Sequence, residues 1–350
     1  MRLGHWGLLA IGVAAAACAS TIGPVVSSVQ VLVVLDSLTD TLRIIPVDSP
    51  DVVHKVRFDP QIATFGNHAL ALKAQVAAIG RGSTVVTVDV VSGHVFCTTT
   101  LASPEPIAAL AFSDADVYAA QAGSNATPHV ESNCGRGEGY VRGGPRSFVN
   151  ARGRLFALTG TLDSTAFSWL TPNLGQSPAT PPLLPADSIP LALPGHAQGA
   201  VLASDGFIYV INAGTGIPNA RLSQVNPVSQ AELNVIPGFG TLPRYIATDG
   251  GDRIFVASAA EGLMVYNIRT GHVERDAFSF IPIGQPRGLA ADDLGRVYVL
   301  TAGSCSSTGN VGSVQVFGAD LVSKRPIPVG RCPAAIGVTD IPAALYNFPN

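Results

Sequence analysis

The amino-acid sequence predicts an all-β fold, a seven-bladed β-propeller, from three observations. A hairpin pattern, clearest in residues 281–303, recurs about every 40 to 50 residues, which is the spacing of propeller blades. Glycine (37 residues) and proline (26 residues) are abundant, as many short strands and tight turns require. Only 13% of the residues are charged, about half the share in an average soluble protein, so much of the surface must be uncharged.

Each repeat begins with a short apolar strand, turns through a segment rich in Asp and Gly, and ends with an alternating strand. In the clearest copy these parts are residues 287–291, 292–295 and 296–301. Five copies are clear, and they begin at Ile107, Arg146, Gln198, Arg244 and Arg287. A degenerate copy begins near His68, and residues 334–340 form a further opening strand.

The two ends of the chain are predicted to meet in one blade. The chain ends too soon after its last opening strand for another four-stranded blade, while residues 30–36 and 41–47 are two strands without partners. Pairing of these strands with residues 335–339 would close the ring and remove the exposed sheet edges that invite aggregation. The sequence therefore predicts a single propeller domain over residues 29–350.

The start of each repeat resembles that of a known family. The segment GQPRGLA (residues 284–290), followed by GRVYV (residues 295–299), is similar to the NHL and YVTN-type repeats of seven-bladed β-propellers. The resemblance covers residues 29–340 and implies this architecture, but no single activity, because such propellers include lactonases, surface proteins and scaffolds. Two segments depart from the pattern: residues 121–144 are irregular and glycine-rich, and residues 168–194 are too rich in proline for central strands.

The N-terminus predicts export. Arg2 precedes an apolar run, residues 8–17, that ends in small residues before Cys18, as in a secretory signal peptide. The tetrapeptide that ends at Cys18 also resembles a bacterial lipobox, in which the cysteine is acylated, although the family usually has Leu where Ala15 stands.

We therefore expect a signal peptide over residues 1–17, lipidation of Cys18 and a linker over residues 18–28. The expected location is the periplasm or the outer face of a bacterial membrane, with a lipid tether. Cleavage without lipidation and an uncleaved anchor are the alternatives.

The four cysteines other than Cys18 are expected to form disulfides, as is usual in an exported chain. Four cysteines permit three pairings, and their two clusters in the sequence favour Cys97 with Cys134 and Cys305 with Cys332. No CxxC or CxxCH motif occurs, so neither a thioredoxin-like site nor an attached haem is indicated.

The candidate binding site is the column of residues that open the inner strands, because these strands line the central channel of a propeller. The polar members of this column are Arg146, Arg244, Arg287, Gln198 and His68. The planar donor fork of arginine suits carboxylate or phosphate, so the column predicts binding of an anion or an acidic partner loop. The alternative is a structural role, in which each guanidinium bonds to carbonyl groups or an Asp of a neighbouring blade.

No catalytic or metal-binding signature occurs in the sequence. The recurring acids lie at hairpin turns, where Asp serves turn geometry, and they are Asp114, Asp205, Asp249 and Asp292. The histidines lack metal-ligand spacing, and there is no HExxH, GxSxG or GxxxxGK[ST] motif. We expect no catalytic residue, metal or cofactor. A net charge of −3 without a basic run argues against nucleic acid as a partner.

The function that the sequence favours is a non-catalytic exported lipoprotein that binds or scaffolds other proteins. One form of this function is an accessory subunit on the outer face of a membrane complex. The low charge fraction favours protein binding, because the cores of protein interfaces are depleted in charge. A lactonase-like hydrolase and a small-anion-binding protein that uses the arginine-bearing mouth are the alternatives.

Overall fold

The computed structural model describes residues 27–37, 41–58, 68–141, 143–160, 169–171, 188–303, 305 and 310–346. The predicted signal peptide and the predicted lipidation at Cys18 lie outside these residues. None of the helices in the described part is long and apolar enough to cross a membrane.

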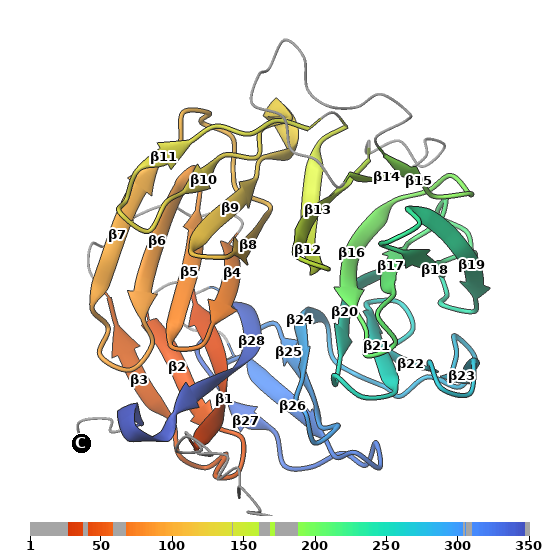
Figure 1. Cartoon of the computed structure of the whole chain (residues 1–350). Coiled ribbons are helices and arrows are strands. Elements are labelled where there is room, and N and C mark those ends of the chain that lie inside the picture. The colour runs from red at the N-terminus through yellow and green to blue at the C-terminus, as the bar shows by residue number, and fades with distance from the viewer. Residues whose placement is uncertain are drawn as a thin grey trace, which may run out of the picture.

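The described part of the chain is all-β, and its strands form seven antiparallel sheets of four strands each. Its helical segments are two single turns, η1 (Ala122–Ser124) and η3 (Ala343–Leu345). Figure 1 shows the sheets standing around the centre of the molecule, with one edge strand of each sheet innermost. We call this edge strand the inner strand.

Six of these sheets take four consecutive strands in chain order. The first three contain β4 (His68–Lys73), β5 (Val76–Arg81), β6 (Thr84–Asp89) and β7 (Val95–Thr100); β8 (Ala109–Ser113), β9 (Asp116–Ala120), β10 (His129–Val130) and β11 (Arg136–Gly137); and β12 (Pro145–Ala151), β13 (Arg154–Thr159), β14 (Trp169–Thr171) and β15 (Ile189–Pro190). The next three contain β16 (Ala197–Leu202), β17 (Ile208–Asn212), β18 (Arg221–Asn226) and β19 (Ala231–Pro237); β20 (Pro243–Thr248), β21 (Arg253–Ser258), β22 (Leu263–Asn267) and β23 (His272–Arg275); and β24 (Pro286–Ala291), β25 (Val297–Thr301), β26 (Ser313–Phe317) and β27 (Ile327–Pro328).

The seventh sheet combines the two ends of the described chain. Its strands, in spatial order, are β28 (Pro333–Pro342), β1 (Ser28–Asp36), β2 (Thr41–Pro46) and β3 (His54–Arg57). The pairing of β1 with β28 is antiparallel and runs along the whole of β1. The two N-terminal strands were predicted from the sequence to lie beside the last inner strand, whereas β3 was not predicted as the outer strand of this sheet.

Neighbouring sheets pack face to face through apolar side chains. The inner strands contact one another in turn, from β4 through β8, β12, β16, β20, β24 and β28, and β28 also contacts β4. Strand β1 is buried on both faces: Val33 and Leu35 pack toward β5 and β6, whereas Leu32 and Val34 pack toward β25 and β26. The continuous apolar run of this strand, which lacks an alternating pattern, follows from that double burial.

The two segments that depart from the repeat contribute outer strands of only two or three residues. The glycine-rich region supplies β10 and β11, and the proline-rich region supplies β14 and β15. Proline has no N–H group to donate to a ladder, so short pairings at an outer edge are what such sequences tolerate. Residues 172–187 lie outside the described part of the chain.

Candidate functional site

Four of the polar residues that open the inner strands share one backbone feature, a shift in register. In β20 the shift lies between Pro243 and Tyr245, which leaves Arg244 as the extra residue of a β-bulge. The same shift occurs around Arg146, Gln198 and Arg287. A bulge frees a residue from the ladder and changes the direction of its side chain. The fold therefore repeats one device that presents a polar residue at the same end of four sheets.

The three arginines differ in their surroundings. Arg146 is half-buried, and its Nε donates a hydrogen bond to the carbonyl oxygen of Gly160 at 3.2 Å. Burial lowers the pKa of Arg146. Arg244 and Arg287 are exposed, and neither forms a hydrogen bond or an ion pair with a described residue. Arg146 thus has the contact expected of a structural residue, while the other two guanidinium groups face solvent.

The two remaining predicted residues occupy the same end of their sheets. Gln198 is half-buried at the bulge of β16. His68 opens β4, where its backbone pairs with Arg81, and its side chain lies outside the description.

Tyr245 follows Arg244 in the chain, lines one cavity with Arg287, and was not predicted from the sequence. Burial raises the pKa of its phenol, and the positive charges of Arg287 and Arg244 act in the opposite direction. Both guanidinium groups therefore lie within electrostatic reach of one hydroxyl group. The sequence did distinguish Tyr245, because the residue at its position, directly after the bulge, is small in the other three copies: Ser147, Gly199 and Gly288.

Tyr245 and Arg287 line a cavity of about 600 Å³ at this end of the inner strands. The rest of its wall is mainly small or aliphatic, and includes Gly288, Ala302, Ala335 and Ile336. Gly288 has to be small, because a Cβ atom there would lie 2.6 Å from the Cγ2 of Ile336 in the neighbouring strand β28. We call this cavity, with Arg244 beside it, the arginine-bearing mouth.

The disulfide Cys305–Cys332 also lines the mouth, and it is one of two disulfides in the described chain. The other is Cys97–Cys134, and both pairings predicted from the sequence are confirmed. The carbonyl oxygen of Cys332 accepts hydrogen bonds from Ser37, from its backbone N at 3.1 Å and from its Oγ at 2.7 Å. One short segment is therefore held both by a covalent bond and by the N-terminal strands.

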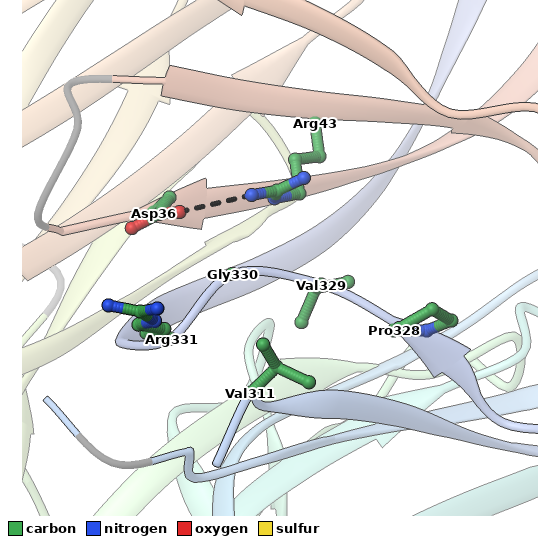
Figure 2. Close-up of a pocket in the computed structure, with 7 residues that line it drawn as sticks. All are labelled: Asp36, Arg43, Val311, Pro328, Val329, Gly330 and Arg331. Atoms are coloured by element: carbon green, nitrogen blue, oxygen red, sulfur yellow. Dashed lines mark hydrogen bonds and ion pairs between the residues drawn. The ribbon is translucent and has the colours of Figure 1, made fainter. Parts of the chain in front are cut away.

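A second cavity, of about 500 Å³, lies beside this segment (Figure 2). Figure 2 shows Asp36 and Arg43 facing one another above Gly330, and Arg43 Nη2 lies 3.3 Å from Asp36 Oδ2. Asp36 is only 2% exposed. Asp36 and Arg43 therefore pair with each other, and the exposed Arg331 also lines this cavity.

The recurring acids serve the hairpin turns. The carboxylates of Asp205, Asp249 and Asp292 each accept a backbone N–H bond from their own turn, at 3.0, 2.8 and 3.1 Å respectively. Asp292 also accepts the Tyr298 hydroxyl at 2.9 Å, and burial together with this carboxylate raises the pKa of Tyr298. Within the described residues, no three His, Cys, Asp or Glu side chains are grouped so that they could hold a metal ion.

Comparison with known proteins identifies the architecture. No protein-family model and no curated protein matches the sequence. A streptogramin B lyase is 13% identical with a TM-score of 0.61, over 80% of this chain and 89% of that chain. The hydrazine synthase of Kuenenia stuttgartiensis is 12% identical with a TM-score of 0.61, over 81% of this chain and 90% of that chain. A chain of a nidogen/laminin complex is 11% identical with a TM-score of 0.50, over 89% of this chain and 98% of that chain.

The chain has a β-propeller fold. At these identities the likeness shows the fold alone, because propellers carry many unrelated functions. The function of this propeller must therefore be inferred from the residues of its arginine-bearing mouth.

Proposed function

We propose that this chain is a non-catalytic, exported propeller that binds an acidic protein partner at its arginine-bearing mouth. In this proposal the seven sheets are the blades of one ring closed by β1 and β28, and residues 29–350 form one domain. Apolar clusters between each pair of neighbouring sheets support the ring. Two disulfides support passage through an oxidising compartment. Lipidation of Cys18 would tether the module to a membrane, where it could serve as an accessory subunit.

The observation that carries the binding role is the pair of exposed arginines beside Tyr245. Two like charges near one half-buried phenol repel each other, and neither forms an ion pair with an acid among the described residues. A carboxylate from a partner would relieve this repulsion and form charge-assisted hydrogen bonds, which are stronger than neutral ones. The likeness to a chain of a nidogen/laminin complex is compatible with a protein partner.

The second candidate function is catalysis at the same mouth, because two of the similar structures are named as enzymes, a lyase and a synthase. A lactonase-like hydrolase would need a metal or a clustered acid and base. Elemental analysis of the natively purified protein distinguishes the two functions: one tightly bound metal ion per chain would favour the hydrolase. Titration with citrate tests the small-anion alternative.

We test the binding role with fluorescein-labelled hexaglutamate as the acidic probe, followed by fluorescence anisotropy. We expect the wild-type protein to bind it, and added salt to weaken binding. The double variant Arg244→Gln/Arg287→Gln should bind about tenfold or more weakly and show a flatter salt dependence, because each hydrogen bond to a charged group contributes about 1.5–3 kcal/mol.

The control is the double variant Arg269→Gln/Arg325→Gln, which removes the same charge from exposed positions in the turns at the opposite end of the sheets. It should bind like the wild type. Equal weakening in both variants would show that only the net charge matters, and would contradict a specific site.

A further inference from the structure

The loop between β23 and β24 carries the most exposed large apolar side chain of the described chain. We call residues 276–281 the aromatic loop. Phe278 is 93% exposed and Phe280 is 36% exposed. Leu242, which lies just before Arg244, is 46% exposed. Single exposed apolar residues are normal on a protein surface, but an exposed aromatic residue beside further apolar side chains marks an interaction site.

The aromatic loop is ordered by its own hydrogen bonds. Asp276 Oδ1 accepts the backbone N–H groups of Phe278 and Ser279, both at 2.9 Å, and the Ser279 hydroxyl at 2.8 Å. The backbone N of Ala277 donates to the carbonyl oxygen of Gly238 at 2.9 Å. Phe278 is therefore held outward by a fixed backbone, and a partner that binds it loses little loop entropy.

The aromatic loop lies at the same end of the sheets as the arginine-bearing mouth. Ile281 pairs with Leu263, at the turn that joins β21 to β22. That turn is next to the start of β20, because Ser258 at the end of β21 pairs with Pro243. Phe280 packs against the same turn, since a Cβ atom on Gly262 would lie 2.7 Å from its Cδ2. The exposed aromatic residue and the exposed cations therefore belong to one face.

The two acids in and next to the aromatic loop already have hydrogen-bonded partners. Glu261, in the turn between β21 and β22, accepts the backbone N of Thr241 at 2.8 Å and the Ser258 hydroxyl. Asp276 is occupied within its own loop. Arg244 and Arg287, in contrast, form no hydrogen bond or ion pair with a described residue.

We propose that this face docks a protruding protein segment that carries a large apolar side chain next to acidic residues. The apolar side chain would cover Phe278 and Leu242, and the acidic residues would enter the arginine-bearing mouth. A protruding segment fits better than a flat lipid surface, because Arg287 lines a cavity. This inference rests on the proposed function and adds the apolar half of the recognition, since aromatic anchors carry much of the energy of protein interfaces.

The test uses short peptides selected from a random phage-displayed library against the full chain, then synthesised and titrated by fluorescence anisotropy. We expect the selected peptides to combine an aromatic or large aliphatic residue with Asp or Glu. Phe278→Ala should weaken their binding about tenfold or more, as truncation of an anchor does. Asp276→Ala, which leaves Phe278 in place but frees the loop, should weaken binding as well.

The matched control is Leu294→Ala, at a side chain that is 59% exposed in the turn at the opposite end of β24. It should leave peptide affinity within about twofold of the wild type, in line with a substitution outside the interface. Circular dichroism melting curves would verify that each variant is folded.

Several results would overturn the inference. Peptides that depend on Arg244 and Arg287 but bind Phe278→Ala normally would remove the aromatic loop from the site and leave the proposed function standing. Peptides that depend on neither would remove both. If Phe278→Ala instead abolishes the binding of phosphatidylcholine–phosphatidylglycerol vesicles, the occupant of this face is a membrane. If it dissociates a dimer in sedimentation velocity, the occupant is a second copy of the chain. Either result would show that the proposal is wrong.

Discussion

Gly330 lies against the carboxylate of Asp36, and a methyl group there would overlap the Oδ2 atom. The acid cannot move aside easily, because its side chain is 3% exposed and pairs with Arg43 at 3.3 Å. Gly330 O also accepts the backbone N of Gly312 at 2.7 Å. At the scale of single residues, the absence of a side chain at Gly330 is what lets the segment before β28 approach the N-terminal strands.

We expect Gly330→Ala to lower the free energy of unfolding by about 1–3 kcal/mol, the usual cost of overpacking a buried site. Urea denaturation measures the change. The control is Gly251→Ala, where the nearest atom to a new Cβ is 3.3 Å away, on the side chain of Asp249 in an exposed turn. Equal destabilisation by the two substitutions would contradict the packing argument.

At the scale of elements, the aromatic loop shows how one carboxylate can order six residues. The hydrogen bonds from Ser279 and Phe278 lower the pKa of Asp276 below its ordinary value. The ionised carboxylate of Asp276 therefore stabilises the loop at pH values above the ordinary carboxyl pKa, where this group is ionised in both the folded and the unfolded chain. That contribution is lost as the pH falls through the lowered pKa of the folded loop.

We expect acidification through this range to shift the backbone amide NMR signals of Phe278 and Ser279, as the loop releases its bonds to Asp276. The variant Asp276→Asn has no charge to lose, so its amide signals should show no such acid-dependent step. Amide signals that respond equally in both proteins would show that another group controls the loop.

At the scale of the whole molecule, the strand pair of β1 and β28 connects the two ends of the chain. Side chains of β1 belong to two apolar clusters, one shared with β5 and β6 and the other with β25 and β26. Each large apolar side chain that is fully buried contributes about 1.5–3 kcal/mol relative to an exposed one. The seventh sheet should therefore contribute a large share of the stability.

Removal of residues 333–350 deletes β28 and leaves one edge of β1 without its partner. We expect this truncation to lower the melting temperature strongly and to promote aggregation through the exposed edge. Removal of residues 343–350 keeps β28, so it should have a much smaller effect. Calorimetry compares the two, and parental melting in both truncations would contradict closure of the ring by β28.

Part of the site was visible in the sequence, because a repeat places equivalent residues at equivalent positions. Arg146, Arg244 and Arg287 were predicted to lie at one end of the inner strands, and the structure places them there at matching bulges. Their different environments were not visible, since the hydrogen bond from Arg146 to Gly160 joins the start of β12 to the residue that follows β13. The aromatic loop was missed, because it lies between repeats and carries no periodic signal.

The sequence by itself determined the strand pattern and the recurring turns, because alternation of apolar residues and turn chemistry are local or repeated properties of a chain. It favoured one cysteine pairing among the three possible ones. The tertiary structure alone decided that Tyr245 and the exposed Arg287 line one cavity and that Phe278 shares their face. It also decided that Asp36 packs against Gly330, residues from opposite ends of the chain. The physical reason is that these contacts join residues from different strands, loops or sheets, so they exist only once the packing of neighbouring sheets has fixed the distances between them.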